Sequence, residues 1–130
     1  MNHGKHLILD LYHCDQDYLD DYDRLSDLLE VALQKANATI LQIMGKKFQP
    51  QGVTLLALLA ESHASIHTWP ELGYCAIDLY TCGDQTNGHE AANHIKEELK
   101  AQFAEEKQIT RSVTLNFDTS APPINGLVWV

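Results

Sequence analysis

Positive charge is scarce in this chain, and long apolar runs are missing. The 130 residues carry 9 lysine and arginine side chains against 18 aspartate and glutamate side chains, a formal net charge of −9. Affinity for nucleic acid depends mainly on clustered positive charge, so we expect no nucleic-acid partner. No apolar run approaches the roughly 20 residues that span a bilayer, and the first residues lack the apolar core of a secretory signal. The sequence therefore predicts a protein with no membrane segment.

Cysteine is also scarce, with only Cys14, Cys75 and Cys82. Three thiols cannot all pair within the chain, and no Cys-x-x-Cys motif is present. We therefore expect reduced thiols and a cytoplasmic protein. Cys75 is one strand period from Ile77, which predicts a core position, whereas Cys14 begins a turn.

The spacing of the histidines suggests a metal site as an alternative. His63 and His67 have the spacing of a helical ligand pair, and Cys75, Cys82 and His89 lie downstream. The segment around the two histidines is predicted to be extended, however, so the imidazoles would not converge. We expect no metal.

What the chain has is enough apolar material for a core. Hydrophobic residues make up 45% of the sequence, which argues against disorder, and the length favours one domain over residues 1–130. Period-two and helical apolar patterns alternate along it. They predict strands at 7–11, 39–44, 53–60, 74–81 and 110–117, an extended segment at 62–70, and helices from about 15 to 36 and 90 to 105. The aspartates of the first helix are expected to form a solvated face: Asp17, Asp20, Asp21, Asp23 and Asp27.

This order predicts an α/β (α+β) two-layer sandwich. A mostly antiparallel sheet would carry both helices on one face, and two similar halves would join near Glu61 and Ser62. The other face of the sheet needs cover, and a dimer is one way to supply it. The apolar C-terminal residues 126–130 are expected to pack on the domain or on a partner subunit.

The most unusual segment follows the apolar run that ends at Ala60. Glu61 and Ser62 come directly after it, and two histidines, a second serine and a threonine follow within six residues. A core strand has no packing reason to end in such a cluster. Hydroxyl, imidazole and carboxylate groups this close together are typical of acyl chemistry, including a chain that cuts its own backbone at a serine.

The cut would begin with attack of the Ser62 hydroxyl on the carbonyl of Glu61, which turns the amide into an ester. Elimination would give a β chain of residues 1–61 and an α chain of residues 62–130, with a ketone, a pyruvoyl group, at position 62. The reaction needs a strained or polarised amide, a donor for the oxyanion and a base. Thr54 could supply the donor hydroxyl if its strand folds back beside the cut, and His67 is the candidate base.

A pyruvoyl ketone can replace pyridoxal phosphate as the electron sink of an amino-acid decarboxylase, after the amine of the substrate condenses with it. Cys82, at a strand end before Gly83, is the candidate acid that protonates the α-carbon. Strict alternation places Ser62 and His67 on opposite faces of an extended strand. A bend or the cut itself would have to bring them together.

Four ordered blocks of the sequence resemble the prokaryotic S-adenosylmethionine decarboxylases. The blocks are at 4–7, 48–54, 60–71 and 73–84, and the likeness extends from about Gly4 to Phe117. It implies that Ser62 becomes the pyruvoyl group, that His67 serves processing and that Cys82 is the catalytic acid. It also implies that Phe48 stacks on the adenine, with His67 on its other face, and that Glu71 binds the ribose.

The resemblance further implies a dimer of processed protomers with sites at the subunit interface, and no metal. The substrate would be S-adenosylmethionine, and the product would be the aminopropyl donor of spermidine biosynthesis. Two departures stand out. Thr54 replaces the usual serine, and Ala64 replaces a larger apolar residue in the expected pocket wall. A decarboxylase of ornithine or arginine is therefore one alternative, and an unprocessed relative that only binds a ligand or partner is another.

Overall fold

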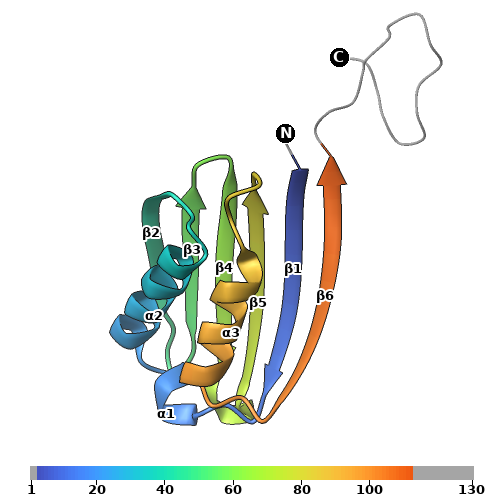
Figure 1. Ribbon diagram of the computed structural model, residues 1–130. Coiled ribbons are helices and arrows are strands. Elements are labelled where there is room, and N and C mark those ends of the chain that lie inside the picture. The colour runs from blue at the N-terminus through green and yellow to red at the C-terminus, as the bar shows by residue number, and fades with distance from the viewer. Residues whose placement is uncertain (1–2, 113–130) are drawn as a thin grey trace, which may run out of the picture.

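The computed structural model describes residues 3–112, and these form one antiparallel sheet covered on one side by helices (Figure 1). The elements, in chain order, are β1 (His3–Tyr12), α1 (Gln16–Leu19), α2 (Tyr22–Lys35), β2 (Ile40–Lys47), β3 (Val53–Leu59), β4 (Ser62–Trp69), the 3-10 helix η1 (Pro70–Leu72), β5 (Tyr74–Cys82), α3 (Gly88–Glu98) and β6 (Phe103–Ser112). The six strands lie in the order β2-β3-β4-β5-β1-β6. Every neighbouring pair is antiparallel.

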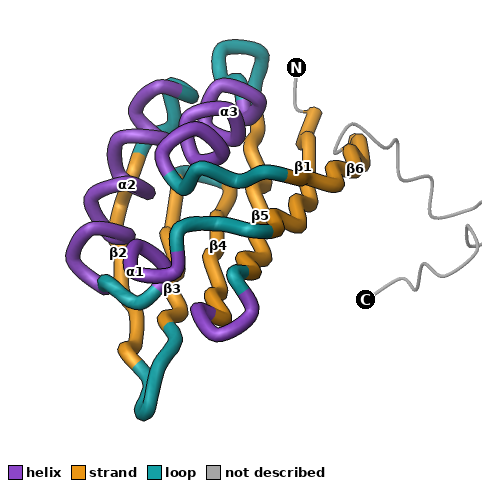
Figure 2. The backbone as a smooth tube through the Cα atoms, turned by 90° about the horizontal axis from the view of Figure 1, so that it is seen from below, coloured by secondary structure: helices purple, strands orange, loops and turns teal. Residues whose placement is uncertain are grey.

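The sheet has one covered face and one open face. Seen along the strands, α1, α2 and α3 all lie on the same side (Figure 2). On β3, Val53, Leu55, Ala57 and Leu59 are buried beneath the helices, and the residues between them are at least partly exposed. Because side chains alternate along a strand, Thr54 and its period-two neighbours belong to the open face. The two-layer sandwich that the sequence predicts is confirmed.

The first predicted helix is broken into two. Asp15 caps α1, as expected, but Asp21 caps a second helix, since its carboxylate accepts the backbone N–H of Arg24 at 3.1 Å. The end of α2 agrees with the prediction. Asn37 adopts a left-handed conformation with φ of 61°, and the N–H of Ala38 donates to the carbonyl of Leu33 at 3.0 Å, which is a Schellman motif.

The predictions that the second helix reaches residue 105 and that the last strand begins only at 110 are wrong. α3 ends at Glu98 because Lys100 turns left-handed, with φ of 54°, and the N–H of Ala101 bonds back to Lys96. Phe103 then begins β6, which pairs with β1 along its whole length. Helices commonly end at a glycine or asparagine, and Lys100 gave no such signal in the sequence. Predicted residues 113–117 and the apolar end at 126–130 lie outside the described residues.

No helix within residues 3–112 is both long and apolar enough to cross a membrane.

Candidate functional site

The bond between Glu61 and Ser62 lies in the tight turn that joins β3 to β4. Leu59 pairs with Ser62, so the turn itself consists of only Ala60 and Glu61. Glu61 has φ of 64°. A left-handed conformation costs a residue with a side chain about 1–2 kcal/mol, because its Cβ crowds the backbone. The residue before Ser62 is therefore held in a strained conformation.

Cys82 comes to the same turn from the end of β5. Its Sγ donates a hydrogen bond to the backbone carbonyl oxygen of Glu61 at 3.2 Å. A donor at this oxygen draws electron density from the carbonyl carbon and stabilises the charge that develops there under attack. The amide to be cut therefore follows a residue in a strained conformation, and its carbonyl is polarised. We call this group, with Tyr80 two residues before Cys82, the turn end: Glu61, Ser62, Tyr80 and Cys82.

Cys82 is the one partly exposed thiol of the three cysteines, all of which are free. Burial raises the pKa of Cys14 to about 11, and burial also raises the pKa of Cys75 well above its usual value. These two thiols are inert core groups, and the core position predicted for Cys75 is confirmed by its 0% exposure.

Four other predicted site residues gather at the opposite end of the strands. Thr54 and His67 are direct partners on β3 and β4, with Thr54 Oγ1 3.0 Å from Nδ1 of His67. Phe48 and Glu71 border the same hollow of about 380 Å³. We call this group the loop end: Phe48, Thr54, His67 and Glu71. An aromatic ring, an imidazole, a hydroxyl and a carboxylate around one hollow can bind a polar ligand that has an aromatic part.

The loop that carries Phe48 is anchored by Asp20. The carboxylate of Asp20 accepts the backbone N–H of Gly52 at 2.9 Å and lies 2.9 Å from Nζ of Lys47. The hydrogen bond from Lys47, followed by that from Gly52, lowers the pKa of Asp20. The prediction that the aspartates of this region form only a solvated face is therefore wrong for Asp20, and for Asp21, which caps α2. The glycine at position 52 is required by its φ of 105°.

Gln51 is another residue that the sequence analysis missed. Its side-chain amide donates to Glu71 at 3.2 Å, which ties the same loop to the carboxylate of the loop end. The sequence signal was its position between Pro50 and Gly52, two residues that are typical of turns.

Within one chain, the loop end does not reach the turn end. Ser62 and His67 are five residues apart on the continuous strand β4, about 16 Å at the rise of an extended strand. Pairing with Leu59 places Ser62 on the covered side, whereas His67, opposite Thr54, lies on the open side. The strand of Thr54 therefore does not fold back beside the cut. A second copy or a rearrangement is needed to combine the groups.

Ala64 lies apart from the loop end. It is 1% exposed and pairs with Ala57 on one side and Leu79 on the other. It also borders an apolar hollow of about 400 Å³ with Leu56 and Leu58. The residue therefore packs in the sheet core rather than beside Phe48.

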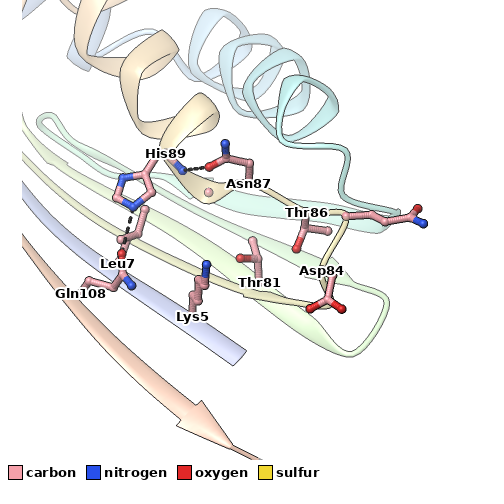
Figure 3. Close-up of a pocket in the computed structure, with 10 residues that line it drawn as sticks. Lys5, Leu7, Thr81, Asp84, Thr86, Asn87, His89 and Gln108 are labelled. Atoms are coloured by element: carbon pink, nitrogen blue, oxygen red, sulfur yellow. Dashed lines mark hydrogen bonds between the residues drawn. The ribbon is translucent and has the colours of Figure 1, made fainter. Parts of the chain in front are cut away.

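The histidines of the metal alternative are dispersed. His63 and His67 lie four residues apart on β4, about 13 Å, and so do not converge. His89 faces Gln108, at 2.9 Å, in a separate hollow of about 350 Å³ near the start of α3 (Figure 3). Among residues 3–112, no group of three His, Cys, Asp or Glu side chains is arranged to hold a metal ion.

The open face carries a broad set of exposed apolar side chains. Strand register places them on the side away from the helices, and their exposures run from 41% to 59%: Met44, Leu56, Leu58, Trp69, Phe103 and Ile109. Large exposed apolar patches are typical of interaction surfaces. Both the loop end and the Cys82 thiol lie on this face.

Comparison with known proteins gives a consistent result. The family model described as S-adenosylmethionine decarboxylase matches residues 5–112. A protein of Synechococcus sp. (strain WH7803) named S-adenosylmethionine decarboxylase proenzyme is 55% identical over 98 residues, which are 75% of this chain and 77% of the relative. A protein of the same name from Prochlorococcus marinus (strain MIT 9211) is 48% identical over 125 residues, 96% of this chain and 98% of the relative.

The fold is also that of a solved relative. The crystal structure of the adenosylmethionine decarboxylase from Aquifex aeolicus VF5 superposes with a TM-score of 0.80 at 36% identity, and the match covers 88% of this chain and 95% of the other.

Proposed function

The chain belongs to the S-adenosylmethionine decarboxylase family, and on that basis we propose that it cuts itself between Glu61 and Ser62 and then decarboxylates S-adenosylmethionine. The observation that carries the proposal is the turn end. A strained residue precedes a serine, and its carbonyl accepts a hydrogen bond from Cys82 at 3.2 Å. These are the features that an N-to-O acyl shift needs.

The cut uses groups of the chain and one water molecule. Oγ of Ser62 attacks the carbonyl carbon of Glu61, the C–N bond breaks, and an ester replaces the amide. A base then removes the α-proton of Ser62, and the Glu61 carboxylate leaves as the new C-terminus of residues 1–61. The enamine left at position 62 tautomerises, takes up water and releases ammonia, which gives the pyruvoyl group. No oxidant is required.

The residues present fit this group. Position 62 is the first residue of β4, so the pyruvoyl would stay covalently attached to the sheet after the cut. When present, it supplies an electron-withdrawing carbonyl that accommodates the negative charge left as carbon dioxide departs. Cys82 lies beside this position, on the open face, and holds a proton that it can deliver to the α-carbon of the substrate.

The loop end would bind the nucleoside. We assign the Phe48 ring to stacking on the adenine, with His67 near its other face, and Glu71 to hydrogen bonds with the ribose hydroxyls. Gln51 donates to Glu71 and would hold that carboxylate in place. An aromatic and carboxylate pair suits a nucleoside better than the short chains of ornithine or arginine, and the names of the relatives also favour S-adenosylmethionine.

A dimer would complete the site. The loop end and the Cys82 thiol share the open face but are separated along the strands, and the apolar side chains of that face are exposed. A twofold axis through the face would place the turn end of one copy over the loop end of the other, and it would bury the apolar patch. His67 and Thr54 would then lie at the turn of the second copy, and Ser62, whose side chain lies on the covered side, would reach them through a rearrangement of that turn. Sedimentation should give twice the mass of one processed protomer.

The product would be decarboxylated S-adenosylmethionine, the aminopropyl donor for spermidine biosynthesis. A cytoplasmic location fits three free thiols, of which Cys82 must stay reduced to carry its proton.

Denaturing mass spectrometry combined with carbon dioxide release tests the proposal. We expect two fragments, 1–61 and 62–130, and an α chain that reacts with a carbonyl reagent. Ser62→Ala should remain a single inactive chain, whereas Ser65→Ala, on the same strand, should be cut. A wild-type chain that stays intact on incubation would instead support a relative that only binds a ligand. Release of carbon dioxide at full rate by a chain with an unchanged Ser62 would exclude the pyruvoyl mechanism.

A further inference from the structure

Tyr80 is a residue of the turn end to which the proposed cleavage gives no role. It lies two residues before Cys82 on β5, so both side chains project from the open face. Its ring centroid is 5.7 Å from that of His6 and 5.4 Å from that of His63, and the Arg111 guanidinium lies 5.3 Å from it. Neighbours on β1, β4 and β6 therefore fix the orientation of the ring.

Gly4 makes room for the phenol. The register of β1 and β5 places Gly4 directly opposite Cys82. A Cβ added to Gly4 would lie 2.5 Å from the hydroxyl oxygen of Tyr80, so the phenol occupies the space of the missing side chain. Directly paired residues have Cβ atoms about 5 Å apart, so the phenol oxygen and the side chain of Cys82 share one region of the open face.

The phenol of Tyr80 is neutral beside the thiol. A side-chain interaction with Cys82 is the largest cause that raises the pKa of Tyr80, and burial is the second. The phenol therefore keeps its proton at neutral pH and is able to donate to the sulfur. The thiol in turn donates to the Glu61 carbonyl at 3.2 Å. Donation from the phenol to the sulfur would place two donors in series, ending on the oxygen that becomes negative under attack.

We propose that Tyr80 is a positioning residue that aims the Cys82 thiol at the Glu61 carbonyl in the uncut chain and at the substrate α-carbon in the processed enzyme. This role rests on the proposed function, since Tyr80 acts through Cys82. With the phenol proton on one side of the sulfur, the S–H points to the other side, where the carbonyl oxygen lies. Charge that develops on that oxygen strengthens both hydrogen bonds. No bond to Tyr80 other than a hydrogen bond forms or breaks.

The self-cleavage rate of the refolded, uncut chain tests the role. Tyr80→Phe keeps the ring and removes the hydroxyl, and we expect it to slow the cut about tenfold, which corresponds to about 1.4 kcal/mol in the barrier. Tyr74→Phe is the matched control. Tyr74 lies on the same strand and face, but its hydroxyl donates to Asp10, far from the turn. This control should be cut at the wild-type rate.

A double-mutant cycle separates positioning from a structural effect. In the Cys82→Ala background, Tyr80→Phe should cause no further slowing, because the thiol through which it acts is gone. A tenfold slowing that persists in that background, or a Tyr80→Phe chain that is cut at the wild-type rate, would overturn the role of Tyr80. A wild-type chain that is never cut would remove the proposed function itself, so the two failures are distinguishable.

The processed enzyme gives a second readout. A misdirected thiol lets the proton reach residue 62 instead of the substrate, which leaves an amine there and inactivates the chain. The mass of the 62–130 fragment should show this product accumulating severalfold faster per turnover in Tyr80→Phe than in Tyr74→Phe. Gly4→Ala should have the effect of Tyr80→Phe, since its Cβ displaces the phenol. Equal accumulation in the two tyrosine variants would contradict the proposal.

Discussion

The turn end and the loop end lie on the same two strands, yet they differ in how they are built. The turn end is local: Glu61 and Ser62 are neighbours in sequence, and one hydrogen bond from Cys82 completes the group. The loop end is assembled from a hairpin loop, two paired strands and the 3-10 helix, and Asp20 holds it from the junction of α1 and α2. The group to which we assign the covalent change is thus local and strained, whereas the group to which we assign substrate binding is assembled from several segments and held by hydrogen bonds between them.

The difference explains why we propose a site shared between two chains. β4 is a rigid spacer of about 16 Å between Ser62 and His67, so neither end can move to the other without breaking the sheet. Two copies face to face solve this problem because a twofold axis exchanges the ends.

The largest expected effect comes from mixing two inactive chains. Ser62→Ala and His67→Ala should each fail to be cut alone. Refolded together in equal amounts, about half of the dimers should be mixed, and each mixed dimer has one site with both Ser62 and His67 intact, so up to about half of the His67→Ala chains should be cut. Mass spectrometry of the fragments measures the yield. No rescue, with dimers present by sedimentation, would show that the two ends act within one chain.

Cys82→Ala tests whether the thiol of the turn end acts as the general acid. This chain should still be cut, but more slowly, and its turnover should fall about 100-fold, as is typical for loss of a general acid. It should also accumulate α chains with an amine at residue 62. Steady-state kinetics and fragment masses measure both effects. Cys14→Ala, which removes a buried thiol, is the control, and normal turnover by the Cys82 variant would remove the acid assignment.

Asp20→Asn tests whether Asp20 anchors the loop that carries Phe48. The ion pair with Lys47 is partly exposed, with side-chain exposures of 32% and 37%, so we expect KM to rise only about threefold while kcat changes little. Asp27→Asn, an exposed change of the same charge on α2, should leave KM unchanged. A fall in kcat without a rise in KM would contradict an anchoring role.

The ion pair between Asp20 and Lys47 also predicts how stability depends on pH. The pKa of Asp20 is lowered in the folded state, so its contribution to stability is present above the ordinary aspartate pKa of about 4 and is lost as pH falls through the lower folded value. The difference in unfolding free energy between wild type and Asp20→Asn should therefore be largest near neutral pH and shrink on acidification. A difference that grows below pH 4 would contradict this sign.

Glu61→Gly is expected to give the smallest effect. Glycine adopts the left-handed conformation without crowding, so the uncut chain should unfold with a free energy changed by at most about 1 kcal/mol. The cut should slow severalfold because the backbone strain at residue 61 is relieved. Comparison with Glu61→Asn, which tolerates the same conformation but keeps a side chain, separates strain from the loss of the carboxylate.

Much of the fold could be predicted from the sequence because the apolar periods are local. The apolar run from Val53 to Ala60 predicted β3 within one residue, and the helical period that ends near residue 36 predicted the end of α2. The end of α3 could not be predicted. Residues after Leu99 are good helix formers, and only pairing with β1 makes the segment from Phe103 a strand.

For the site, the sequence alone determined which groups are proposed to carry the chemistry, since Ser62 after Glu61, the histidine segment and Cys82 are fixed by order and residue type. Tertiary structure decided how they combine. Pairing of β3 with β4 placed Thr54 beside His67 and away from Ser62. The end of β5 placed the Cys82 thiol within hydrogen-bond distance of the Glu61 carbonyl. Such contacts join residues far apart in the chain, and only strand register, which is set by the burial of one face of the whole sheet, determines them.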